Sequence, residues 1–239
     1  NIREISDTPI DIHIISDRPE DYFDKIRECK IEYVTFQYEN LSRKLTFPKS
    51  DNTKYGLAIV SETPVEVFED YQNECDFILI MTTTPGQSGG KFQKDNFKKI
   101  RKFRNSFHGK EIHVDGGVNH EVSFILRILG VHSIVSGSYL VNHNSIGTAL
   151  LHLKSSIIHS DYKLKDFMID VEDAPVLTED RMQVRDIIHS IDQHKLGFTI
   201  IQKANGELMG LSSNADVRRG LLKHIDNFNA LQPEDIINF

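Results

Sequence analysis

The chain has 239 residues, with 28 Lys and Arg against 35 Asp and Glu, which gives a formal charge of −7. At roughly 100–200 residues per domain, this length allows one large domain, or a medium domain with a small one. The acidic balance, without a basic stripe, excludes nucleic acid as the main partner. No apolar run approaches the ~20 residues that cross a bilayer and no secretory signal opens the chain, so we expect a soluble cytoplasmic protein with no membrane partner. The two cysteines, Cys29 and Cys75, have no CxxC spacing, so neither a disulfide framework nor a thiolate zinc site is indicated.

The first two thirds of the chain alternate short β-branched runs with longer amphipathic stretches, a pattern typical of parallel strands joined by helices. Strands are predicted over 10–15, 33–38, 55–60, 77–81, 111–114 and 133–135. Helices are predicted from Pro19, from Thr63 and Pro64 to about residue 73, and over 94–107, 120–129 and 145–158. These elements make six βα units before about residue 158.

Six βα units are compatible with two architectures. They can form an open sheet with helices on both faces, which leaves two strand edges exposed. They can also form part of an eight-stranded barrel, in which case we expect two further units upstream of Asn1.

A second part of the chain begins after a polar connector near residues 160–166. Its predicted elements are a helix over 178–194, strands over 198–202 and 208–211, and a helix from about Ala215. Asn205 and Gly206 between the two strands indicate a hairpin turn. We therefore predict two domains, 1–160 and 167–239.

Three glycine-bearing loops directly follow predicted strands, where parallel α/β folds place their sites. Glycines let backbone N–H groups approach an anion, and a helix that follows presents its positive end, so these loops suit a phosphate. Each loop alone is equally an ordinary turn, but all three point to one face. The loops span residues 84–92, 114–119 and 136–138 and contain Gly89, Gly116, Gly117, Gly137 and Ser138.

Asp115 and His13 are the candidates for chemistry at that face. Asp115 can transfer a proton or bind a metal beside a phosphate, or it can cap a helix. His13 lies inside an apolar strand, where a histidine is either a core residue or, if the strand lines the same barrel, half of an N/O pair with Asp115 suited to zinc, iron or manganese. Met81 ends a strand and lines a pocket or packs in the core.

These motifs, in this order and at these separations, resemble those of ribulose-phosphate 3-epimerases. The likeness is carried by residues 11–15, 81–92, 114–119 and 137–138 and covers residues 10 to about 157. It implies a (β/α)8 TIM-type barrel, here lacking its first two βα units, and an isomerase of carbohydrate metabolism that moves a proton at carbon-3 of a pentulose phosphate through an enediolate. By position it implies His13 as a metal ligand, Asp115 as metal ligand and general acid/base, and phosphate-binding turns at Gly89, Gly116, Gly117, Gly137 and Ser138.

The chain also departs from the family pattern. The family's first two strands supply an opposite aspartate and two further metal ligands, and they have no counterpart here. Gln37 stands where the family tends to have a histidine. With His13 and Asp115 as the matched ligands, we expect this chain alone to hold a divalent zinc, iron or manganese ion weakly or not at all.

Residues 167–239 resemble a single CBS motif, most like that attached to arabinose-5-phosphate isomerases. The likeness rests on residues 174–176, 196–201, 206–210 and 215–219. It implies a small α+β segment that regulates the protein or pairs it into a homo-oligomer. Asp216 matches a nucleotide-ligand position of that motif, with a helix N-terminal carboxylate as the structural alternative.

Two functions are consistent with these observations. The first is a metal-assisted sugar-phosphate 3-epimerase of the ribulose 5-phosphate/xylulose 5-phosphate type with a regulatory CBS segment. The alternative is a non-catalytic sugar-phosphate-binding or regulatory protein with a CBS assembly segment. Both take a small-molecule sugar phosphate as partner.

Overall fold

The computed structural model describes residues 2–48, 52–84, 86, 89–156 and 159–239. Pro85, Gln87 and Ser88 of the predicted phosphate loop, and Ile157 and Ile158 of the helix predicted to residue 158, lie outside the described residues. The described part of that helix ends at Lys154. The chain divides into two compact units, Asn1–Phe167 and Met168–Phe239. No helix in the described parts of the chain is long and apolar enough to span a membrane.

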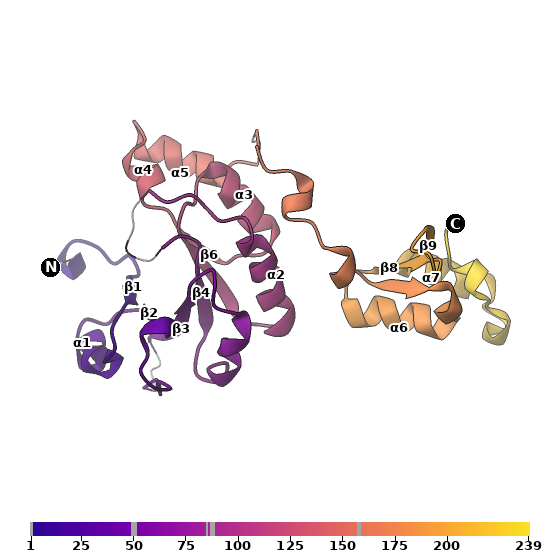
Figure 1. Ribbon diagram of the computed structural model, residues 1–239, viewed down its shortest axis with the longest axis horizontal. Coiled ribbons are helices and arrows are strands. Elements are labelled where there is room, and N and C mark those ends of the chain that lie inside the picture. The colour runs from indigo at the N-terminus through magenta and orange to yellow at the C-terminus, as the bar shows by residue number, and fades with distance from the viewer. Residues whose placement is uncertain (1, 49–51, 85, 87–88, 157–158) are drawn as a thin grey trace. The chain divides into compact units, whose positions relative to one another are not determined.

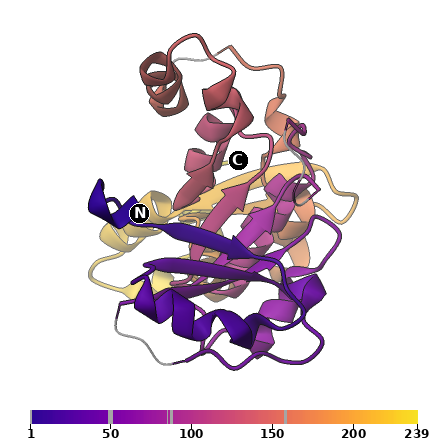
Figure 2. The ribbon, with the colours of Figure 1, turned by 90° about the vertical axis from the view of Figure 1, so that its left-hand side faces the viewer.

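The first unit is built on a curled sheet of six parallel strands in chain order (Figure 1), as predicted. The pattern of β-branched runs therefore located every strand of this sheet to within one or two residues. The strands are β1 (Asp11–Ile14), β2 (Tyr33–Gln37), β3 (Lys54–Ile59), β4 (Phe77–Met81), β5 (Glu111–Asp115) and β6 (Ser133–Val135). The twist that curls them is visible in Figure 2.

Helices connect these strands and pack on one face of the sheet. They are α1 (Phe23–Glu28), α2 (Asn96–Ser106), α3 (His120–Ile128), α4 (Ser138–Val141) and α5 (Ile146–Lys154). The helix predicted over 63–73 is wrong in type, because a 3-10 helix, Val65–Asp70, occupies that place. In a 3-10 helix positions i and i+3 eclipse, so Val65 and Phe68 both enter the core, and two β-branched valines disfavour an α-helix here.

The two faces of the sheet differ in chemistry. Side chains such as Val34, Phe36, Leu57 and Ile80 pack with the helices in one continuous apolar core. The opposite face, called the inner face here, has a small apolar cluster of Ala58, Leu79 and Met81. Because side chains alternate along a strand, the same face carries the aromatic rings of Tyr33 and Phe77, the latter stacked on His113. Its other positions include the polar residues His13, Thr35, Gln37 and Asp115.

The second unit is a three-stranded sheet with two helices. Its elements are β7 (Val176–Thr178), α6 (Val184–His194), β8 (Phe198–Gln202), β9 (Leu208–Ser213) and α7 (Asn214–Lys223). Strand β7 pairs parallel to β8, and β8 pairs antiparallel to β9 through the predicted hairpin. Strand β7 was not predicted from the sequence, because three residues are too few to show the alternation of a strand.

Candidate functional site

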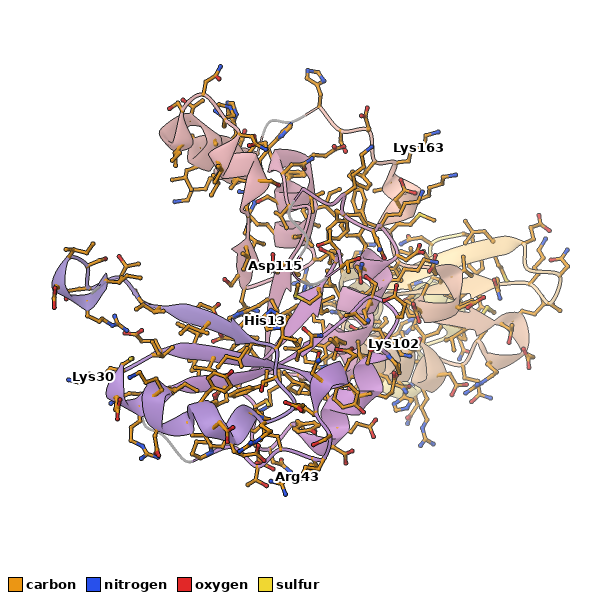
Figure 3. The ribbon with its side chains drawn as sticks, turned by 60° about the vertical axis from the view of Figure 1, so that its left-hand side comes forward. His13, Lys30, Arg43, Lys102, Asp115 and Lys163 are labelled. Carbon is orange, nitrogen blue, oxygen red and sulfur yellow. The ribbon has the colours of Figure 1, made fainter. Side chains whose placement is uncertain are left out.

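Strand tilt brings His13 and Asp115 to the same height on the inner face. The pairing register leads from His13 through Thr35, Gly56 and Phe77 to Glu111, which is four residues before Asp115. In a barrel-type sheet, residues at one height along the barrel axis shift by roughly one position from each strand to the next. Four strand steps therefore account for the four residues between Glu111 and Asp115. Figure 3 shows both side chains in the middle of the sheet.

His13 and Asp115 influence each other's pKa values. Burial raises the pKa of the Asp115 carboxyl, and the neighbouring His13 imidazole opposes that shift. Burial lowers the pKa of His13, which Gln37 and Asp115 oppose. Asp11, two residues before His13, has a pKa raised by burial and by Asp115. A half-buried carboxylate and a neutral imidazole thus face each other, ready to accept a proton or a cation.

Thr82 fixes the backbone around Asp115. Its hydroxyl donates to the carbonyl oxygens of Asp115 at 3.0 Å and Gly116 at 2.6 Å, and its N–H donates to the Asp115 carbonyl at 2.8 Å. Thr82 is fully buried, directly after β4. The strand ends of β4 and β5 are therefore held together where the carboxylate emerges.

Two glycine loops pack backbone against backbone beside this point. Gly117 has a φ of +62°, and a Cβ placed on it would lie 2.3 Å from the backbone N of Phe92 and 2.9 Å from the carbonyl oxygen of Gly90. Only glycine allows both this conformation and this approach. We call residues 89–92 and 116–118 together the glycine cradle.

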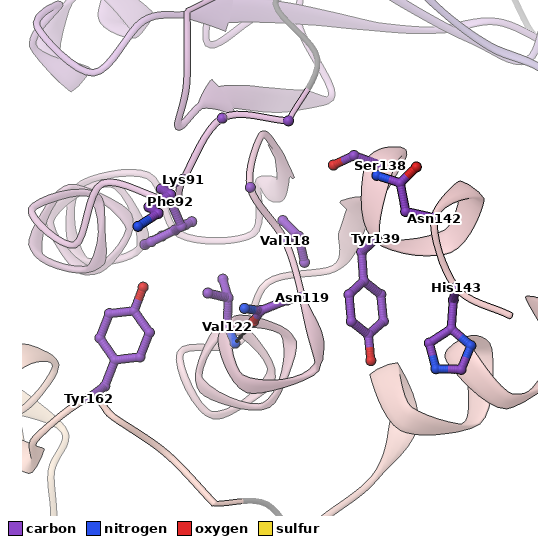
Figure 4. Close-up of a pocket in the computed structure, with 13 residues that line it drawn as sticks. Lys91, Phe92, Val118, Asn119, Val122, Ser138, Tyr139, Asn142, His143 and Tyr162 are labelled. Atoms are coloured by element: carbon purple, nitrogen blue, oxygen red, sulfur yellow. Dashed lines mark hydrogen bonds between the residues drawn. The ribbon is translucent and has the colours of Figure 1, made fainter.

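The glycine cradle opens into a cavity of about 620 Å³ (Figure 4). Asn119 caps α3 at this cavity, since its Oδ1 accepts the N–H of Val122 at 2.9 Å. The N-terminus of a helix and glycine N–H groups favour an anion. None of the described lining residues is acidic, and Lys91 adds a positive charge.

The structure gathers some predicted site residues and separates others. Gly89, Gly117 and Ser138 line the cavity, whereas Gly116 and Gly137 lie next to lining residues in the sequence. Met81 is buried in the inner-face cluster and pairs in register with Asp115.

Asp216 lies in the second unit, inside a capping box at the start of α7. Its carboxylate accepts from the N–H of Ser213 at 2.8 Å and from the side-chain amide of Asn238 at 2.7 Å. The carboxylate is therefore engaged in local structure, and a nucleotide role for it stays a prediction.

Five lining residues were not predicted from the sequence: Val122, Tyr139, Asn142, His143 and Tyr162. Tyr139, Asn142 and His143 belong to or follow α4, a four-residue helix that no periodicity could reveal. Tyr162 comes from the connector, where only its isolated aromatic ring in a polar segment gave any signal.

The donor set on the inner face partly fits a metal ion. The Nε2 atom of His13 is buried, and an imidazole nitrogen of this kind can bind a divalent ion. In the same part of the chain no three His, Cys, Asp or Glu side chains gather as a metal site would require. His13 and Asp115 could therefore hold a divalent cation only with help from another kind of ligand.

A curled parallel α/β sheet with its helices on one face and a cavity beside its strands is typical of barrel-type enzymes. Residues 1–141 match the model of the Ribulose-phosphate 3 epimerase family. The chain belongs to this family and is an isomerase-class enzyme, an epimerase.

Curated relatives agree with that assignment. Ribulose-phosphate 3-epimerase of Bacillus subtilis is 28% identical over 163 residues, 65% of this chain and 75% of the relative. The cytoplasmic isoform of Oryza sativa is 26% identical over 68% of this chain and 75% of its own length. The enzyme of Methanocaldococcus jannaschii is 25% identical over 70% and 75%. A solved FabK mutant from Thermotoga maritima aligns with a TM-score of 0.40 at 19% identity, over 56% of this chain and 45% of that chain, which is too weak to carry an argument.

Proposed function

We propose that this chain is a sugar-phosphate 3-epimerase of the ribulose 5-phosphate/xylulose 5-phosphate type, built on a (β/α)8 barrel of which it carries the last six βα units. The observation that carries the proposal is the strand register, which places His13 of β1 and Asp115 of β5 on the same inner face of the sheet. Gly117, two residues after Asp115, belongs to the anion cavity. A substrate phosphate held there leaves the carbon chain to extend toward the pair.

Asp115 is the residue that moves the proton in this proposal. Burial raises the pKa of its carboxyl, which makes the carboxylate a stronger base than an exposed aspartate. It takes the proton from carbon-3 on one face of the sugar, and the electron pair of that bond moves onto the adjacent carbonyl oxygen. Inversion then needs a proton returned on the opposite face by a second acid. Thr82 keeps the carboxylate in place through the backbone.

His13, with Asp115, is the proposed anchor of a divalent zinc, iron or manganese ion. Burial lowers the pKa of His13, so the ring is neutral and offers a lone pair at Nε2. A cation bound there supplies positive charge next to the oxygens on which negative charge develops. The rest of the site orients the substrate through the glycine cradle, Lys91 and Ser138.

Exchange of the carbon-3 hydrogen of ribulose 5-phosphate with D2O tests this role directly, because it reports proton removal without requiring inversion. Asp115→Asn should slow exchange by about 10²–10⁴-fold, the usual contribution of a positioned acid or base. Asp24→Asn, at an exposed carboxylate of α1, is the matched control and should exchange like the parent. Undiminished exchange in Asp115→Asn would refute the assignment.

A non-catalytic sugar-phosphate-binding protein is the second candidate. The observation that favours it is that no three His, Cys, Asp or Glu side chains gather as a metal site in the described parts of the chain. This candidate predicts binding of ribulose 5-phosphate in the glycine cradle with no exchange at carbon-3, which the same experiment detects.

For the second part of the chain, residues 167–239, we propose a CBS-like segment that pairs two copies of the protein, beside a barrel domain of residues 1–160. Its α+β make-up supports this proposal, as does an open hollow on α6 that includes Ile188, Phe228 and Leu231. Sedimentation of the full chain tests it, since pairing through α6 should be weakened by Ile188→Asp. We also propose a cytoplasmic location, because one relative is named as a cytoplasmic isoform.

A further inference from the structure

Tyr162 brings a phenol to the cavity of the glycine cradle from outside the part of the chain that matches the family model. It lies in the connector, residues 160–167, whereas the match covers residues 1–141. Its side chain lines the cavity with Lys91 and Phe92, and Figure 4 shows the hydroxyl end of the ring turned toward these two residues. The cavity therefore has a polar group that the glycine loops do not supply.

The hydroxyl of Tyr162 is available to a ligand. The hydrogen bonds that Tyr162 makes with the described residues involve only its backbone. Burial, together with the negative charges of Glu121 and Asp166, raises the pKa of the phenol, so the group stays protonated. A protonated phenol is a hydrogen-bond donor.

The ring of Tyr162 is held at a fixed place beside the glycine cradle. It packs edge to face on Phe97 of α2, with ring centroids 5.4 Å apart. Phe97 in turn stacks on Phe92 at 4.7 Å. Because Phe92 belongs to the glycine cradle, the two contacts set the position of the phenol relative to the cradle.

Glu121, in the first turn of α3, holds the backbone that carries Tyr162. Its carboxylate accepts from the Ser160 hydroxyl at 2.5 Å, from the N–H of Tyr162 at 3.1 Å and from the N–H of Asp161. Burial works to raise the pKa of Glu121, but these hydrogen bonds outweigh it and lower the pKa, so Glu121 is a carboxylate. The start of the connector is thus fixed to the helix that begins at the cradle.

The far end of the connector is held by α2. Lys94 forms an ion pair with Asp166 at 3.1 Å, and the Arg101 guanidinium donates to the carbonyl oxygen of Phe167. Helices α2 and α3 each follow one loop of the glycine cradle. The connector therefore joins the two helices that carry the cradle loops, and Tyr162 lies between its anchor points.

We propose that Tyr162 is an anion-binding residue of this site: its hydroxyl donates a hydrogen bond to the phosphate group held by the glycine cradle, and Glu121 is the residue that positions it. The inference rests on the proposed function and deepens it, since it assigns a further contact to the phosphate of the same ligand class, a phosphate monoester. The cradle supplies backbone N–H groups and Lys91 supplies charge. Tyr162 adds a donor for another of the three terminal phosphate oxygens.

Phosphate binding by the full chain tests the assignment without turnover. The probes are inorganic phosphate, titrated by 31P NMR, and ribulose 5-phosphate, titrated by calorimetry. Tyr162→Phe removes the hydroxyl and keeps the ring, so the affinity for both probes should fall by about 10- to 100-fold, the range of a hydrogen bond to a charged group. Tyr22→Phe, at an exposed tyrosine, is the matched control and should bind like the parent.

A double-mutant cycle tests the positioning role of Glu121. Glu121→Ala should weaken phosphate binding by about 10-fold in the parent and much less in Tyr162→Phe, because Glu121 acts through the hydroxyl. A merely structural contribution would weaken binding equally in both backgrounds. Glu28→Ala, at an exposed carboxylate of α1, is the control.

Urea midpoints establish that each variant is folded. Parent-like phosphate affinity in Tyr162→Phe would overturn the inference, and so would a loss confined to ribulose 5-phosphate, which would place the hydroxyl on the sugar. Equal weakening by Glu121→Ala in both backgrounds would overturn the positioning role. A parent chain that binds phosphate and loses affinity in Tyr162→Phe, but shows no D2O exchange, supports the inference and contradicts the proposed function.

Discussion

Replacing Gly117 with alanine should damage the glycine cradle far more than it damages the fold. The new Cβ would meet the Phe92 backbone N at 2.3 Å, while contacts below 3.4 Å force a neighbour to move. The segment that contains Gly90 and Phe92 must therefore shift by about 1 Å. A misplacement of that size in a site can reduce its function by about 100-fold. We expect ribulose 5-phosphate affinity, measured by calorimetry, to fall by that order.

Gly109 offers a control that separates backbone strain from the clash. It also has a positive φ, +82°, but a Cβ there meets nothing within 4 Å. Both alanine variants pay about 1–2 kcal/mol for the left-handed conformation. Gly117→Ala should lose about 1–3 kcal/mol more in urea unfolding because of overpacking, and only it should lose ligand affinity. Equal behaviour of the two variants would refute the close-packed cradle.

Three further predictions concern stability. Phe68→Ala should cost about 3–5 kcal/mol in urea unfolding, because Phe68 is fully buried with its ring 5.0 Å from that of Phe103. Burial lowers the pKa of Lys99 from 10.5 to about 8. Between these pH values the unfolded state binds more protons than the folded state, so the free energy of unfolding should rise with pH by about 1 kcal/mol after solvent screening. The same pH profile in the parent chain and in Lys99→Met would contradict this prediction. Burial works to raise the pKa of Asp216, but hydrogen bonds from Ser213 and its neighbours lower it. The contribution of Asp216 to the free energy of unfolding is therefore present above the unfolded pKa of about 3.9 and is lost as pH falls through the folded pKa. Asp216→Asn should remove this acid sensitivity and about 1–3 kcal/mol of stability at pH 7, measured by thermal unfolding.

The site was only partly predictable from the sequence, because some of its features depend on a few neighbouring residues and others on contacts between distant segments. The glycine loops can be read locally, since a positive φ and close backbone approach demand glycine wherever they occur. The sequence shows Gln37 as a departure from the family pattern, but its burial and its hydrogen bond to Glu39 cannot be predicted from one strand. His143 lines the cavity because it follows α4, a helix too short to be detected in the sequence.

The sequence by itself determined the positions and parallel direction of the six strands, the places of the glycine loops and the hairpin of the second unit. These features follow from side-chain periodicity and local backbone sterics, which act within a few residues. Only the tertiary structure decided that the six strands lie in chain order in one curled sheet, that Val65–Asp70 is a 3-10 helix, and that Tyr139 and Tyr162 line the cavity. Strand tilt, core packing and hydrogen bonds between distant segments set these outcomes, and they depend on which neighbours the folded chain brings together.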